Sequence, residues 1–139
     1  MRKSAVVVTH MQQSLSDIEW LHGSMATLDD RPLIPFAEET IEQLNALSSA
    51  LLKDPVSRQY PDVVTFGFFC RRANLLKLKE QYVHPGLRIG RGMVFHIAPS
   101  NVPVNFAYSM AAGLLSGNTN VLRVSQKSFP QVDIIVKHM

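Results

Sequence analysis

Residues 92–126 constrain the fold of this chain more than any other stretch. Residues 94–97 form a short apolar run that ends at a proline-containing corner, 99–103. A helical segment follows and is closed by Gly117, and residues 119–124 read as a second strand. Two strands joined by a helix are normally parallel, and a parallel pair needs cover on both faces. The stretch therefore predicts an α/β fold organised around a strand–helix–strand unit.

The rest of the chain predicts elements that lead into this unit and follow it. We expect a strand at residues 4–9, helices at residues 36–53 and 62–81, and a further helix from Pro130. Residues 11–30 show no clear period. The last helix reaches the end of the sequence with no strand after it. We therefore expect this chain to be the front part of a longer protein.

Composition and charge exclude several classes of protein. The chain has 139 residues, a net charge of +3 and a single cysteine, Cys70, so an internal disulfide framework is excluded. The basic residues are dispersed and form no stripe with interleaved aromatics, which argues against nucleic-acid binding. Its apolar runs are far shorter than the roughly 18 residues of a membrane span, and the run near the amino terminus is too short for a signal peptide. We expect a cytoplasmic protein.

Few side chains in the sequence have the spacing of a reactive site. Cys70 lies on the apolar face of the predicted helix 62–81, which favours core packing over nucleophilic chemistry. The histidines share no metal-ligand spacing, so no metal site is predicted. His96 is expected to be a strand residue with a satisfied ring. The glycines of 90–92 precede a strand, whereas a dinucleotide-binding loop follows one, so we expect a turn there.

Asn101 has two possible roles. It lies just after the first predicted strand of the unit and just before the helix. Ligands of parallel α/β sheets bind at this edge, where a carboxamide can donate a hydrogen bond to a developing oxyanion. Asparagine is also a favoured helix cap, and spacing alone favours the cap.

Three sequence runs resemble the aldehyde dehydrogenase superfamily. They are Ile-Ala-Pro-Ser-Asn-Val-Pro at 97–103, Gly-Leu-Leu-Ser-Gly-Asn-Thr at 113–119 and Val-Leu-Arg-Val-Ser-Gln at 121–126. With Tyr-Pro-Asp at 60–62 and Arg-Arg-Ala-Asn-Leu at 71–75, the chain is more specifically similar to the acyl-CoA reductase branch, which includes the fatty-acid reductase of bacterial bioluminescence. The similarity covers about residues 60–133.

The resemblance implies a partial doubly wound, Rossmann-like cofactor domain of the aldehyde dehydrogenase fold. Residues 1–55 would be a strand and helical lead-in, and residues 56–139 an incomplete NAD(P)-binding domain. The implied activity is the NAD(P)-dependent reduction of an acyl-CoA or acyl-protein substrate to a long-chain aldehyde, through an acyl-thioester on a catalytic cysteine. The full-length protein is expected to be oligomeric.

The resemblance also assigns site residues. Asn101 matches the side chain that stabilises the oxyanion. The residues that match the cofactor-binding positions are Ile97, Ala98, Pro99, Ser100, Arg123, Ser125 and Gln126.

Three departures from the family pattern affect the expected chemistry. Arg123 stands where a lysine is usual, and Gln126 stands where NAD-preferring members often have a glutamate. A 2′-phosphate would meet less repulsion there, and Arg123 or Lys127 could pair with it, so we expect NADPH, with NADH as the alternative. Cys70 precedes the cofactor unit and does not match the nucleophile. The chain alone is therefore expected to be inactive.

Two other interpretations of the sequence stay open. The chain could belong to another member of the superfamily, such as an aldehyde dehydrogenase proper or a γ-glutamyl phosphate reductase. It could also be a non-catalytic nucleotide-binding or interaction module that keeps the same scaffold.

Overall fold

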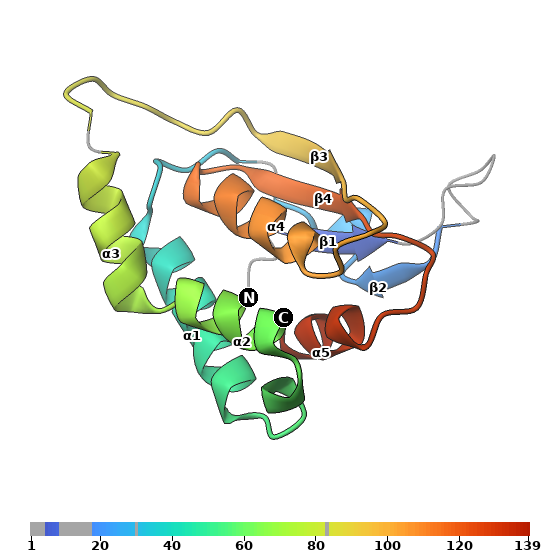
Figure 1. Ribbon diagram of the computed structural model, residues 1–139. Helices are drawn as coiled ribbons and strands as arrows, with labels where there is room; N and C mark the ends of the chain where they lie inside the picture. The colour runs from blue at the N-terminus through green and yellow to red at the C-terminus, as the bar shows by residue number, and fades with distance from the viewer. Residues whose placement is uncertain (1–4, 9–17, 30, 83) are drawn as a thin grey trace.

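The strands form one mixed sheet. The computed structural model describes residues 5–8, 18–29, 31–82 and 84–139. Within these residues the sheet has the order β2-β1-β4-β3, and both β1 and β3 run parallel to β4, whereas β2 is antiparallel to β1 (Figure 1). The strands are β1 (Ala5–Val8), β2 (Trp20–His22), β3 (Met93–Ile97) and β4 (Thr119–Arg123). The predicted α/β class and the parallel β3–β4 pair are confirmed.

Helices connect and cover the strands. The α-helices are α1 (Glu38–Lys53), α2 (Pro61–Phe69), α3 (Arg72–Gln81), α4 (Asn105–Leu115) and α5 (Pro130–His138), and the short 3-10 helices are η2 (Met25–Thr27) and η3 (Ser57–Gln59). Helices α1 and α5 lie where the sequence predicts them. Strand β2 was not predicted, because residues 11–30 have no periodic pattern.

The predicted helix at 62–81 is wrong, because the structure breaks it into α2 and α3. Cys70 ends α2, and Arg71 has an extended backbone (ψ 137°) before α3 begins. Two asparagine side chains satisfy backbone groups at the break. The Asn74 amide donates to the Phe69 carbonyl at 2.8 Å, and the Arg72 N–H donates to Asn45 Oδ1 at 2.9 Å. The apolar period continues through the break, so the sequence alone does not reveal it.

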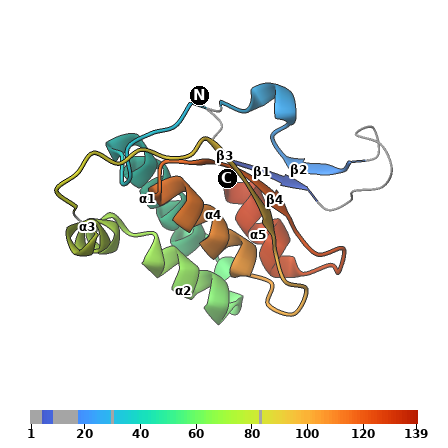
Figure 2. The ribbon, with the colours of Figure 1, turned by 90° about the horizontal axis from the view of Figure 1, so that it is seen from above.

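Helix α4 packs closely on the inner face of the sheet. Figure 2 shows α4 and α5 on one side of the sheet and η2 on the other. The buried side chains of Val7 and Leu122 belong to the same core cluster as those of α4. Gly113 permits the close approach, since a Cβ at this position would overlap the Asn120 carboxamide. His96 Nε2 lies 2.7 Å from Asn120 Oδ1, which confirms the expected satisfied ring of His96.

A backbone junction holds the amino ends of β3 and β4. The Leu33 N–H donates to the Gly117 carbonyl at 2.9 Å, and the Gly90 N–H donates to the Leu33 carbonyl at 2.8 Å. Gly117 has a φ of 83° after α4, as expected of a helix-ending glycine. The Thr119 N–H then donates to the Gly92 carbonyl at 2.8 Å. Of the turn predicted at residues 90–92, the structure shows only a bend at Gly92, where φ is 100°, directly before β3.

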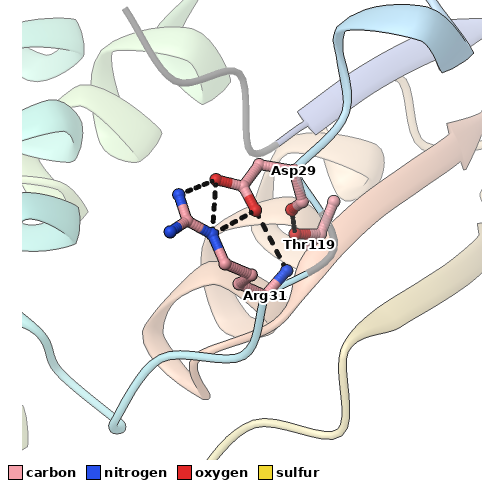
Figure 3. Close-up of polar contacts among 3 residues, drawn as sticks. All are labelled: Asp29, Arg31 and Thr119. Carbon is pink, nitrogen blue, oxygen red and sulfur yellow. Dashed lines mark hydrogen bonds and ion pairs between the residues drawn. The ribbon is translucent and has the colours of Figure 1, made fainter.

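A second contact ties the segment before α1 to the amino end of β4. The Thr119 hydroxyl donates to the backbone carbonyl of Asp29, as Figure 3 shows. The Asp29 carboxylate in turn accepts from the guanidinium of Arg31, with Nη2 at 2.8 Å from Oδ2. These contacts all lie at the amino end of β4.

Strand β3 is one of the two edge strands of the described sheet. The side chains of Met93, Phe95 and Ile97 share one face and are 46%, 48% and 68% exposed. Alternate residues of the strand face the helices and are half-buried. The apolar run that predicted the strand is therefore only half covered.

Candidate functional site

The carboxyl ends of β3 and β4 lie side by side and open into two loops. Ile97 is paired with Arg123 in the parallel register, so both strands end at the same level. The Ala98 N–H donates to the Arg123 carbonyl at 2.9 Å, which extends the pairing by one residue. The loop 98–104 then leads to α4, and the loop 124–129 leads to α5. Ligands of parallel α/β sheets bind at this kind of edge.

A narrow crevice lies between these two loops. Its cavity volume is about 10 Å³, close to the volume one water needs, so it does not enclose a nucleotide. A ligand larger than a few atoms would have to lie across its mouth. The lining is apolar except for one hydroxyl: Ala98, Pro99, Val102, Pro103, Phe106, Val124, Ser125, Phe129 and Val132. No carboxylate is among these lining residues, so an anionic group at the mouth meets no negative charge from them.

The structure brings together some of the predicted cofactor residues and not others. Ala98, Pro99 and Ser125 line the crevice. Arg123 is half-buried at the end of β4 and is not a lining residue. The remaining predicted residues, Ile97, Ser100 and Gln126, are exposed on the two loops and at the end of β3, outside the crevice lining.

Asn101 is exposed in the loop between β3 and α4. Helix α4 begins at Asn105, and its N-cap residue is Val104, with no side-chain cap. The capping role that spacing favoured for Asn101 is therefore wrong. Asn101 is not part of the crevice lining, although its neighbours Pro99 and Val102 are. Within the described residues its carboxamide has no hydrogen-bond partner, so it is available to a ligand.

The loop after β4 carries the polar groups nearest the crevice. The Lys127 N–H donates to Ser125 Oγ at 3.1 Å, so the hydroxyl fixes the turn and keeps its own O–H free to donate. The Arg123 guanidinium makes no ion pair within the part of the chain that the structure describes. Its positive charge is therefore not neutralised by a carboxylate of that part.

Sequence reasoning missed the apolar walls of the crevice. Phe129 and Val132 come from the start of α5, and Phe106 comes from the first turn of α4. The apolar spacing from Phe129 onward predicted the helix correctly. It gave no sign that the first turn of this helix faces the crevice, because that depends on how the loop 124–129 turns.

Cys70 has the properties of a core residue. Its side chain is fully buried, and burial raises the pKa of its thiol from 9.0 to about 12. A thiol with this pKa forms almost no thiolate near neutral pH and is a poor nucleophile. The predicted packing role is confirmed, although Cys70 ends α2 and does not lie in the middle of a helix.

The comparison with protein families decides the assignment of the chain. The family described as acyl-CoA reductase (LuxC) matches residues 7–137, which is nearly all of the 139-residue chain. The chain belongs to the acyl-CoA reductase (LuxC) family. The resemblance to the acyl-CoA reductase branch is thus confirmed. No curated protein and no solved structure gives a significant match.

Membership in the LuxC family gives a general activity for the chain's family. Its members are acyl-CoA reductases, and such reductases generally depend on a nicotinamide cofactor.

In the described parts of this chain, no helix has the length and apolar character needed to cross a membrane.

Proposed function

We propose that this chain is the amino-terminal part of an NADPH-dependent reductase that converts an acyl-CoA or acyl-enzyme to a long-chain aldehyde through a thioester. The observation that carries the proposal is the pair of parallel strands β3 and β4, whose loops meet at one crevice inside the segment that matches the LuxC family. This is the edge at which parallel α/β sheets hold nucleotides. We propose further that residues 56–139 are an incomplete Rossmann-like domain of the aldehyde dehydrogenase fold, with residues 1–55 as its lead-in.

The residues in and beside the crevice fit a phosphorylated nucleotide, with Arg123 at the end of β4, outside the crevice lining. Arg123 brings a positive charge that no carboxylate of the described residues pairs with, and Ser125 brings a hydroxyl donor. Ala98 and Pro99 give an apolar wall at the end of β3. When bound, NADPH would supply the hydride. The other family positions, Ile97 at the end of β3 and Ser100 and Gln126 on the two loops, would contact it from exposed positions.

The preference for NADPH rests on charge. Gln126 has no carboxylate to accept hydrogen bonds from a ribose diol or to repel a 2′-phosphate. Arg123 can pair with such a phosphate, because a guanidinium binds phosphate oxygens through two parallel N–H groups. Lys127 lies on the same loop and adds a second positive charge. NADH lacks that phosphate, so these positive charges would not strengthen its binding.

Asn101 is proposed to act on the substrate. Its exposed carboxamide has no structural partner within the described residues and does not cap α4. In the proposed reaction the N–H of this carboxamide donates to the oxygen of the acyl carbonyl as negative charge develops on it. Donors of this kind act most strongly where water is excluded.

The catalytic cysteine is proposed to lie outside this chain. Cys70 is its single cysteine, and it is buried with a raised pKa. A nucleophile needs the opposite environment, exposed to substrate and with a lowered pKa.

The complete reductase is proposed to be a cytoplasmic oligomer.

Aldehyde formation from an acyl-CoA and NADPH tests the proposal. The complete reading frame that contains this sequence should form the aldehyde, and Cys70→Ala in that protein should retain the rate of the unmodified enzyme. The 139-residue chain alone should form none. Turnover by the chain alone that is lost in Cys70→Ala would show that the nucleophile is misassigned. Failure of the complete protein to reduce any acyl-CoA would overturn the proposed function.

A further inference from the structure

We draw no further inference here: the strongest candidate, the exposed apolar edge of the sheet formed by Met93, Phe95 and Ile97 of β3, carries none because nothing in the structure shows what covers it.

Discussion

His138 Nε2 lies 2.7 Å from Asp54 Oδ2, so the last turn of α5 is tied to the residue that ends α1. Both side chains are largely buried, at 18% and 9% exposure. The other carboxylate oxygen of Asp54 accepts the Val56 N–H at 2.8 Å. The hydrogen bond from His138, and then that from Val56, hold the pKa of Asp54 below its ordinary value of 3.8. The contact joins two helices that are far apart in the sequence.

This contact predicts how stability depends on acid. Because the folded-state pKa of Asp54 is lowered, its stabilising effect is complete above the ordinary carboxyl pKa of 3.8 and is lost as the pH falls through the lower, folded value. Asp54→Asn should therefore lower the melting temperature at pH 7. The difference from the unmodified protein should shrink as the pH falls below 3.8.

The matched control is Asp133→Asn, an exposed carboxylate on α5. It should change the melting temperature little at any pH. An Asp54→Asn protein that melts with the unmodified protein at pH 7 would show that the contact does not stabilise the fold.

Because α4 lies so close to β4, adding a single methyl group at Gly113 should destabilise the fold. Gly113→Ala would place a Cβ into the Asn120 carboxamide, which is fully buried and engaged with His96. We expect a loss of about 1–3 kcal/mol in the free energy of unfolding, measured by urea denaturation. Gly67→Ala is the control, because its Cβ would come close only to the flexible Leu52 side chain, at 3.0 Å, and would lie at an ordinary contact distance of 3.7 Å from Leu51 Cβ. Gly67→Ala should lower the free energy of unfolding by less than about 1 kcal/mol, since alanine favours the helix more than glycine does. Equal costs for the two substitutions would contradict the packing described for α4.

The core of the fold could be predicted from the sequence where one local pattern decides an element. The apolar spacing of Ile41, Leu44, Leu47 and Leu51 predicts α1, and all four side chains are buried. Gly117 predicts the end of α4 in the same local way, because the chain needs a positive φ after the helix and glycine adopts one readily.

The parts that could not be predicted depend on contacts between distant residues. The break between α2 and α3 relies on Asn45, which lies 27 residues before Arg72. Strand β2 has only three residues and is held by its pairing with β1. In the candidate site, the sequence identified the two loops but not the walls that Phe106 and Phe129 supply. These walls depend on how α4 and α5 dock on the sheet.

Cofactor preference is the third prediction. In the complete reductase, Arg123→Leu should weaken NADPH binding by roughly ten- to a hundredfold and change NADH binding much less, because the lost contact is charged. Gln126→Glu should move the preference toward NADH, since a carboxylate repels a 2′-phosphate and accepts hydrogen bonds from a ribose diol. Titration of each protein with both cofactors, followed by fluorescence, measures these effects.

Lys77→Ala is the control for these titrations, because Lys77 is exposed on α3, outside the two loops. It should leave both affinities unchanged. If Arg123→Leu weakens NADPH and NADH equally, the guanidinium does not recognise the 2′-phosphate.

The proposed oxyanion role of Asn101 is tested by the turnover number of Asn101→Ala in the complete reductase. Asn105→Ala is the matched control, because Asn105 begins α4 and is a nearby asparagine with no assigned role. If the Asn101 carboxamide donates to the oxyanion, Asn101→Ala lowers kcat by roughly 10²–10³-fold. The melting temperature and the NADPH affinity should stay unchanged, and Asn105→Ala should keep the rate of the unmodified enzyme. An unchanged kcat for Asn101→Ala, or a loss that follows a lower melting temperature, would contradict it.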